Sequence, residues 1–282
     1  MIATVNKTKE ILNKYNLQAK KRFGQNFLID SNIVNKIIAT ANIDKENIVI
    51  EIGPGIGAMT ELLALNAKKV ICFEIDIDMV NIINNEVKNK CERNNIEIYL
   101  KDFLKVNLED YDLESNRVIV VSNLPYYITT PIIFKLLDEK KVSEIYVMVQ
   151  DEVARRLVGL PKTKDYGSLS VMIKYLADAR FEFKVARNCF LPAPNVDSAI
   201  VSIKRKKNEY RINFEANFAK FVQSIFEMRR KTLINNILKK YSFERSELEN
   251  KIVNITNNVN CRAEDLSLDE IVTIYKNLGL DK

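Results

Sequence analysis

The chain has 282 residues, of which 47% are apolar, and this composition suits a packed α/β domain with a smaller companion and excludes a disordered protein. Its apolar runs are no longer than a strand, its four cysteines are scattered and it has no histidine, which argues against a membrane span, a disulfide framework, a metal site and imidazole-based catalysis. The net charge is +6, and basic residues gather within the first 30 positions and at Lys204-Arg205-Lys206-Lys207, so both a nucleic-acid partner and ordinary solvated surface remain open.

The chain begins with a polar, lysine-rich segment. Residues 1–24 show only a weak helical pattern around Ile11, Leu12 and Tyr15, so we expect a basic, flexible tail. The same segment lacks the apolar stretch of a signal peptide, and we therefore expect a cytoplasmic protein. Apolar residues at helical spacing then predict a helix over Ser31–Ala41.

Strand-like and helix-like segments alternate from there to residue 150. We predict strands at 48–52, 69–74, 97–100, 118–121 and 144–149, with helices between them at 57–65, 79–89 and 131–139. Strands separated by helices of this length indicate βαβ units and a mostly parallel sheet covered on both faces. After a helix near 167–176, the segments 181–184 and 198–204 are strand-like and would suit an antiparallel hairpin at the sheet edge.

Beyond residue 207 the apolar residues keep helical spacing, and no strand signal of comparable strength returns. We therefore predict three parts. A tail over residues 1–24 precedes a Rossmann-like α/β domain over residues 25–207, and a small all-helical domain follows over residues 208–282.

The first motif with chemical content is Glu51-Ile52-Gly53-Pro54-Gly55-Ile56-Gly57, directly after the first predicted strand. Glycines such as Gly53 and Gly55 at a strand-to-helix turn let the backbone turn sharply and let a ligand approach closely. Glu74 ends the second predicted strand, where an acidic side chain can accept hydrogen bonds from both hydroxyls of a ribose. NAD and S-adenosylmethionine both contain such a ribose, and a purely structural turn is a further alternative.

The residues after the third predicted strand bear on this choice. Asp102 is placed to accept a hydrogen bond from an adenine amino group. The pair Asp102-Phe103 at this point is more typical of a methyltransferase than of a dehydrogenase. S-adenosylmethionine is therefore the expected cofactor.

The second motif is Asn123-Leu124-Pro125-Tyr126, at the end of the fourth predicted strand. The exocyclic amine of adenine is a poor nucleophile because its lone pair is delocalised into the ring. The side-chain carbonyl of Asn123 and a backbone carbonyl, which we expect to be that of Leu124, can hold both amine protons and direct the lone pair toward a methyl group. Pro125 stiffens the turn, and Tyr126 offers a face on which the base can stack.

The alternative interpretation of this motif is an ordinary turn after a buried strand. Its occurrence after the glycine turn, Glu74 and Asp102, in that order, favours the methyltransferase interpretation. A sulfonium is already an activated methyl donor, so positioning can supply the rate without a general base, and a chain without histidine can perform this chemistry.

On these residues the chain resembles the KsgA/Dim1 family of ribosomal RNA adenine N6,N6-dimethyltransferases, relatives of the Erm resistance methyltransferases. The resemblance runs from about residue 20 to 238 and includes Phe23-Gly24-Gln25-Asn26-Phe27-Leu28, Phe73-Glu74-Ile75-Asp76, the stretch 190–198 from Phe190 to Ser198, and Arg229-Arg230-Lys231-Thr232-Leu233. It implies a class I methyltransferase fold in which segment 23–28 closes over the donor.

The resemblance also implies site residues, a cofactor and a partner. The implied S-adenosylmethionine site consists of Asn26, Leu28, Gly53, Gly55, Glu74, Ile75, Asp102, Phe103 and Asn123. Phe190 is implied to flank the target base opposite Tyr126, with a hydrophobic plug as the alternative. The implied substrate is a pair of adjacent adenosines in the 3′-terminal hairpin loop of 16S rRNA, within the small ribosomal subunit or its precursor, and we expect a monomer.

Three alternatives stay open. An Erm-type enzyme would act on large-subunit rRNA, but Leu124 before the proline and Asp197 before Ser198 are more typical of the small-subunit branch. A ribosome assembly factor could act mainly by binding, and a small-molecule methyltransferase would need neither the basic patches nor the helical domain. Lys220 and Lys231 would share a face on an unbroken helix and are candidates for holding RNA phosphates.

Overall fold

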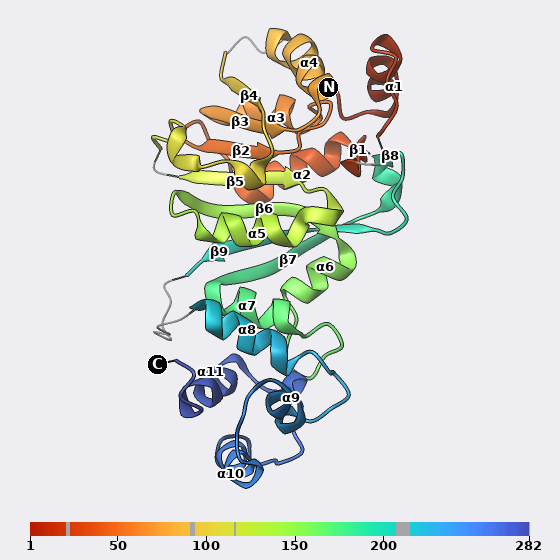
Figure 1. Cartoon of the computed structure of the whole chain (residues 1–282). Coiled ribbons are helices and arrows are strands. Elements are labelled where there is room, and N and C mark those ends of the chain that lie inside the picture. Colours follow the sequence, from red (N-terminus) through yellow and green to blue (C-terminus); the bar gives the residue numbers. More distant parts are fainter. Residues whose placement is uncertain (21–22, 91–93, 116, 207–214, 282) are drawn as a thin grey trace. The chain divides into compact units, whose positions relative to one another are not determined.

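The computed structural model describes residues 1–20, 23–90, 94–115, 117–206 and 215–281 (Figure 1). Lys21, Arg22, Lys207 and Cys91, together with residues 208–214 at the start of the predicted helical domain, lie outside the described residues. The chain divides into two compact units. The sheet unit comprises Met1–Ala154 and Arg180–Arg205, and the helical unit comprises Arg155–Ala179 and Lys206–Lys282.

A seven-stranded sheet in the order β4-β3-β2-β5-β6-β9-β7 forms the centre of the fold (Figure 1). β2, β3, β4, β5 and β6 run parallel to their neighbours, whereas β9 is antiparallel to β6. The strands are β2 (Ile48–Ile52), β3 (Lys69–Glu74), β4 (Ile96–Leu100), β5 (Val118–Asn123), β6 (Val142–Gln150), β7 (Ala177–Val185) and β9 (Ser198–Arg205). The predicted mostly parallel sheet is thus confirmed, and the two late strands lie at one end of it, with β7 outermost.

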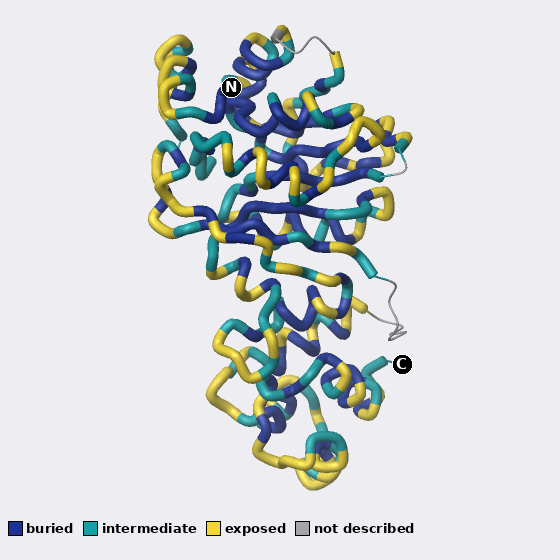
Figure 2. The backbone as a smooth tube through the Cα atoms, turned by 180° about the vertical axis from the view of Figure 1, so that it is seen from behind, coloured by how far each residue is buried: buried dark blue, intermediate teal, exposed yellow. Residues whose placement is uncertain are grey.

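Helices cover both faces of the sheet. α5 lies in front of the strands in Figure 1. The helices α2, α3 and α4 pack against alternate residues of the strands in one buried apolar cluster. The inner strands β2, β3 and β5 are almost continuously buried (Figure 2). These elements are α2 (Ser31–Ala41), α3 (Thr60–Asn66), α4 (Ile77–Ile82), α5 (Thr129–Asp138) and α6 (Asp151–Leu157), with short turns η4 (Phe103–Lys105), η5 (Leu108–Asp110), η6 (Tyr126–Ile128) and η7 (Arg187–Cys189).

The helix predicted over residues 79–89 changes geometry part of the way along. α4 passes into a π-helical turn, η2 (Ile83–Val87), and then into a 3-10 turn, η3 (Lys88–Lys90). The turn presents Val87 to the glycine-rich loop, where a Cβ built on Gly57 would lie 2.6 Å from Cγ2 of Val87. Single π-helical turns of this kind occur frequently at functional sites.

The first residues do not form the flexible tail that the sequence led us to expect. α1 (Val5–Lys14) begins at Thr4, whose hydroxyl accepts a hydrogen bond from the backbone N–H of Lys7. Ile2 and Ile11 are buried in the core of the sheet unit. The weak helical pattern therefore belonged to a docked helix, in which Ile11 is buried and Leu12 and Tyr15 pack partly buried against the core.

The helical unit contains α7 (Ser168–Leu176), α8 (Glu215–Ile225), α9 (Leu233–Lys240), α10 (Arg245–Thr256), η8 (Ala263–Asp265) and α11 (Leu268–Asn277). The predicted helical C-terminal region is thus confirmed. Its core is aromatic: the ring centroid of Phe218 lies 4.9 Å from that of Tyr175 and 5.2 Å from that of Tyr275. Because Tyr175 lies on α7, residues 155–179 belong to this unit, whereas the sequence division at residue 207 placed them with the sheet. Among the described residues, every helix is too short or too polar to cross a lipid bilayer.

Candidate functional site

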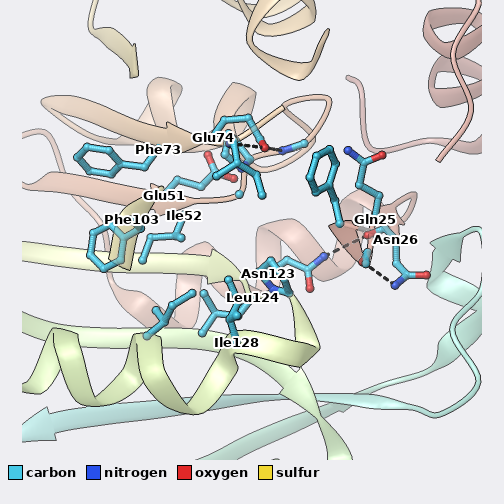
Figure 3. A pocket seen from close by; sticks show the side chains of 18 of the residues that line it. Gln25, Asn26, Glu51, Ile52, Phe73, Glu74, Phe103, Asn123, Leu124 and Ile128 are labelled. Atoms are coloured by element: carbon cyan, nitrogen blue, oxygen red, sulfur yellow. Dashed lines mark hydrogen bonds between the residues drawn. The ribbon is translucent and has the colours of Figure 1, made fainter. Parts of the chain in front are cut away.

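A cavity of about 230 Å³ lies at the carboxyl ends of the parallel strands (Figure 3). Its walls come from the loops after β2, β3, β4 and β5. The strand order reverses between β2 and β5, and the cavity lies at this point, which is the usual ligand position in such sheets. The cavity brings together all the predicted donor-binding residues and most of the predicted catalytic ones: Asn26, Leu28, Gly53, Gly55, Glu74, Ile75, Asp102, Phe103, Asn123, Leu124, Pro125 and Tyr126.

The glycine-rich loop has a backbone that side chains would distort. Gly53, Gly55 and Gly57 have φ angles of +68°, +57° and +88°, a region that favours glycine. A Cβ on Gly55 would lie 3.2 Å from the Phe27 ring, which also lines the cavity. The loop therefore lets segment 23–28 approach the backbone and leaves the space beside it open.

Glu74 is held in place by backbone donors. Its carboxylate accepts hydrogen bonds from the N–H groups of Gly55 (3.2 Å), Ile75 (2.8 Å) and Asp76 (2.9 Å). Burial nevertheless raises the pKa of Glu74 above its ordinary value. A fixed acceptor beside the glycine loop matches the ribose-binding role that the sequence predicts for this residue.

Glu51 is a cavity residue to which the sequence analysis gave no role of its own. It is 1% exposed, and Thr60 donates a hydrogen bond of 2.7 Å to its carboxyl group. Burial raises the pKa of Glu51 to about 8, so the group is largely protonated at neutral pH. A carboxyl group inside the otherwise apolar strand Ile48–Ile52 was the signal that pointed to such a residue.

Asp102 and Phe103 follow β4 and also line the cavity. One oxygen of Asp102 accepts a hydrogen bond of 3.0 Å from the backbone N–H of Leu104, which fixes the carboxylate and leaves its second oxygen for a ligand. Phe103 packs against Phe73, with ring centroids 5.5 Å apart, and both rings line one end of the cavity (Figure 3). This pairing provides an apolar slot next to an acceptor, which suits an adenine ring.

The amide of Asn123 has a defined orientation. Its nitrogen donates a hydrogen bond of 3.2 Å to the backbone carbonyl of Asn26, and a carbonyl can only accept (Figure 3). The amide oxygen is therefore the free end of the side chain. Among the described residues, no donor reaches this oxygen or the backbone carbonyl of Leu124, so both are available as acceptors.

The turn after Asn123 is fixed by further hydrogen bonds. The N–H of Leu124 donates to the Met148 carbonyl at 3.1 Å, and the Pro125 carbonyl accepts from the N–H of Ile128 at 3.2 Å. The half-buried Tyr126 shares a hydrogen bond of 2.8 Å between its hydroxyl and that of Ser198, and burial raises the pKa of the Tyr126 hydroxyl.

Phe190 is the one predicted site residue that the structure does not bring to the cavity. It lies in β8 (Phe190–Leu191), which pairs with β1 (Phe27–Leu28) so that Phe190 is opposite Leu28. The side chain is 2% exposed and is part of the apolar core. Its place in this structure corresponds to the hydrophobic plug that the sequence analysis kept as the alternative.

Lys20 and Gln25 are attached to the rim of the cavity by a polar cluster that the sequence analysis did not single out. Lys20 contacts the carboxylates of Asp76 at 2.8 Å and Asp78 at 2.6 Å, and the amide of Gln25 donates to Asp76 at 2.9 Å. Burial alone would raise the pKa of Asp76, but the hydrogen bonds from Lys20 and Gln25 outweigh it and lower the pKa. Asp76 follows Glu74 by two residues, so the cluster joins Lys20 and Gln25 to the end of β3 that carries Glu74.

The basic residues proposed to hold RNA have mixed surroundings. Lys220 and Lys231 do not lie on one unbroken helix, because α8 ends at Ile225 and α9 begins at Leu233. The face they were expected to share is therefore absent. Lys204 is 3.5 Å from the carboxylate of Glu144, so part of that basic run is paired within the fold. Within the described ranges, no three His, Cys, Asp or Glu side chains gather in a way that would hold a metal ion.

Comparisons with known proteins agree with this geometry. The sequence model of a family described as ribosomal RNA adenine dimethylase matches residues 16–278. The proteins called ribosomal RNA small subunit methyltransferase A in Bacillus mycoides (strain KBAB4) and Bacillus anthracis (strain A0248) are each 43% identical to the chain over 291 residues, which covers 100% of the chain and 98% of each relative.

Two solved structures have a similar fold over most of the chain. A dimethyladenosine transferase from Plasmodium falciparum has a TM-score of 0.75 at 26% identity, covering 89% of this chain and 97% of that one. The 23S rRNA methyltransferase ErmE has a TM-score of 0.67 at 26% identity, covering 90% of this chain and 100% of that one.

Proposed function

The chain belongs to the ribosomal RNA adenine dimethylase family, and we propose that it dimethylates N6 of two adjacent adenosines in the 3′-terminal hairpin loop of small-subunit rRNA during ribosome biogenesis. It is an S-adenosylmethionine-dependent methyltransferase. The observation that carries the proposal is the amide of Asn123, whose oxygen is presented at the cavity while its nitrogen is held by Asn26. Identity of 43% over the whole chain to small-subunit enzymes supports that subunit over the large one, since ErmE is 26% identical.

The cavity residues fit the methyl donor. The glycine loop leaves room for a ligand beside the backbone, Glu74 offers a fixed acceptor for ribose hydroxyls, and Asp102 offers one for an adenine amine. When bound there, S-adenosylmethionine supplies an electrophilic methyl group. Glu74 and Asp102 would orient the donor through its ribose and its adenine. Segment 23–28 would limit the access of water, because Gln25 holds it to Asp76 at the cavity rim.

On the substrate side, the chain supplies acceptors and a stacking surface. The amide oxygen of Asn123 and the carbonyl of Leu124 would each accept one N–H of the adenine amine, which favours a more tetrahedral nitrogen whose lone pair is less delocalised into the ring and is aimed at the methyl group. Tyr126 would stack on the base, an interaction worth about 1–3 kcal/mol. After transfer, the cationic nitrogen loses one proton to solvent, so no residue needs to act as a general base. An unpaired loop adenosine suits this cavity, since extruding a paired base costs a few kcal/mol more.

The remaining parts would recognise the ribosomal particle. We assign donor binding and catalysis to residues 25–207 and recognition of RNA shape to residues 208–282, with α1 and the run at 204–207 adding positive charge. The substrate would be 16S rRNA within the small subunit or its precursor. The protein would act on it as a monomer in the cytoplasm.

The decisive experiment uses purified small ribosomal subunits whose hairpin-loop adenosines are unmethylated. The subunits are incubated with the protein and methyl-labelled S-adenosylmethionine, and the products are mapped by nuclease digestion and mass spectrometry. We expect N6,N6-dimethyladenosine at the two loop positions, and a loss of at least a hundredfold in rate for Asn123→Ala, in which a positioned acceptor is removed.

Asn32→Ala is the matched control, because Asn32 is an exposed asparagine on α2, away from the cavity. It should retain the wild-type rate. Label in large-subunit RNA alone would assign the protein to the resistance branch. Tight binding to the subunit without label in either RNA would favour an assembly factor.

A further inference from the structure

The stacking tyrosine is attached to a strand that lies outside the cavity. The hydroxyl of Tyr126 is 2.8 Å from that of Ser198, which is 72 residues further along the chain at the start of β9. Ser198 is 0% exposed and does not line the cavity. The hydrogen bond therefore joins Tyr126, which lines the cavity, to Ser198, which does not.

Ser198 is itself fixed from several directions. It pairs with Gln150 at the last position of the antiparallel ladder between β6 and β9. The carboxylate of the preceding residue, Asp197, accepts a hydrogen bond of 2.9 Å from the N–H of Arg187 and lies 2.8 Å from the ammonium of Lys184. The Asp197 carbonyl accepts a further bond of 3.0 Å from the N–H of Asp151. The serine hydroxyl thus has a position set by sheet and loop together.

Tyr126 has a backbone that is held by the hydrogen bonds of the turn, but these bonds do not fix its ring. It opens the short turn η6, and Pro125 at the start of that turn makes no side-chain capping bond. The ring is only half-buried, and the neighbouring Tyr127 is 58% exposed. The hydroxyl at the far end of this ring shares a hydrogen bond with Ser198, and that bond restricts rotation of the ring about its two side-chain bonds.

We propose that Ser198 is a positioning residue for methyl transfer: it holds the ring plane of Tyr126 so that one face is presented to the target adenine before the base arrives. This inference rests on the proposed function, since it assumes that Tyr126 stacks on the base. A stacking surface that is already oriented avoids the entropy of ordering the ring in the transition state. Losing the hydrogen bond should therefore lower kcat and leave binding of the RNA largely intact.

The test is a double-mutant cycle with Ser198→Ala, Tyr126→Phe and the two together. Single-turnover rates, KM for unmethylated small subunits and the affinity for S-adenosylmethionine are measured for each. We expect each single variant to lower kcat roughly fivefold, as for loss of one neutral hydrogen bond, with KM and donor affinity changing less than twofold. The double variant should match the single ones, because all three lack the same bond.

Ser202→Ala is the matched control: it makes the same change on the same strand, but the Ser202 hydroxyl bonds Glu182 instead of Tyr126. It should keep wild-type kcat. Wild-type kcat in Ser198→Ala, multiplied effects in the double variant, or an equal loss in Ser202→Ala would each overturn the inference. If the wild-type protein methylates a different rRNA, the proposed substrate is wrong, and the same ratios measured on that RNA still decide the role of Ser198.

Discussion

The donor cavity contains a carboxyl group that is neutral under ordinary conditions. Glu51 is fully buried, accepts a hydrogen bond from the Thr60 hydroxyl and has no cationic partner among the described residues. Burial of the protonated carboxyl group therefore costs less free energy than burial of the ionised one. Glu74 lines the same cavity, and its charge would repel a charge on Glu51, which protonation of Glu51 avoids.

This protonation links stability to pH. The unfolded chain releases the Glu51 proton near pH 4.5, whereas the folded protein keeps it to about pH 8, so the folded state binds more protons throughout this window. Stability should therefore fall as pH rises from 4.5 to 8, by on the order of 3–5 kcal/mol in total from this group. The chain has no histidine, so few other groups titrate in the same range.

Chemical unfolding between pH 5 and pH 8.5 checks the prediction. Glu51→Gln should flatten the decline in the free energy of unfolding and be the more stable protein at pH 8, whereas Glu46→Gln, at an exposed position, should follow the wild type. Glu74, whose pKa is also raised by burial, would leave a residual slope of the same sign. An unchanged slope in Glu51→Gln would mean that Glu51 is ionised in the folded protein.

Single residues were predictable where a local pattern carries the chemistry. The glycine turn, Glu74, Asp102 and the Asn123 motif each follow a strand, and parallel strands bring their carboxyl ends to one edge of the sheet, so their meeting in one cavity followed from the strand assignments. The proton on Glu51, the bond between Tyr126 and Ser198 and the burial of Phe190 depend on tertiary neighbours distant in sequence, which no local pattern specifies.

At the scale of elements, the glycine loop and the π-helical turn are fitted to each other. The turn extends the helix with one extra residue per hydrogen-bonded ring and brings Val87 against Gly57. Burial of Glu86 in the same turn adds contacts with the N-terminal segment, since Lys14 and Tyr15 both donate to its carboxylate. The donor loop, η2 and α1 are therefore packed as one block.

Gly57→Ala should disturb this block. The new methyl group would combine a φ of +88° with a contact of 2.6 Å to Val87, and we expect a loss of about 2–4 kcal/mol in unfolding free energy together with weaker donor binding. Gly167→Ala is the control, because no atom lies within 4 Å of its Cβ position and its backbone is extended. Denaturant titration and calorimetric donor binding give the two readouts. Equal stability of the two variants would contradict close packing of Gly57 against Val87.

The predicted elements were most accurate where apolar periodicity is strong. The helix predicted at Ser31–Ala41 and the strands at Ile48–Ile52 and Lys69–Glu74 have the predicted bounds. The prediction failed for α1, whose apolar residues are few. It located α7 but assigned it to the sheet domain, because a partner of α7 in the helical unit comes 40 residues later. Periodicity identifies an element and its buried side but does not identify what that side packs against.

At the scale of the whole molecule, charge separates the two kinds of ligand. The net charge of +6 suits a polyanion, and the donor cavity is lined with carboxyl groups that suit a small cation. Many basic side chains are paired with acidic neighbours, as Lys239 is with Glu227 at 2.7 Å. Binding of RNA would then depend on the excess of positive charge over the whole surface, which salt screens effectively.

Raising the salt concentration from 50 to 200 mM should weaken binding to small ribosomal subunits at least tenfold, because each phosphate contact releases a counterion. The affinity for S-adenosylmethionine should change less than twofold, since its binding releases no counterions from phosphates. Filter binding and calorimetry measure the two affinities. Salt-independent binding of the subunit would argue for recognition through ribosomal proteins or base-specific contacts instead of phosphates.

The fixed amide of Asn123 also has a consequence for how the reaction ends. Since its nitrogen is tied to the Asn26 carbonyl, the side chain can offer only a lone pair and cannot turn over to suit a different base. In the proposed reaction, adenine would bring two protons to this oxygen and to the Leu124 carbonyl, the monomethylated base would bring one, and the dimethylated base would bring none. Each transfer would then remove one of the contacts that hold the base, and the finished product would leave both acceptors without a partner. The affinity of the site for the base would therefore fall with each methylation, which favours release of the dimethylated product.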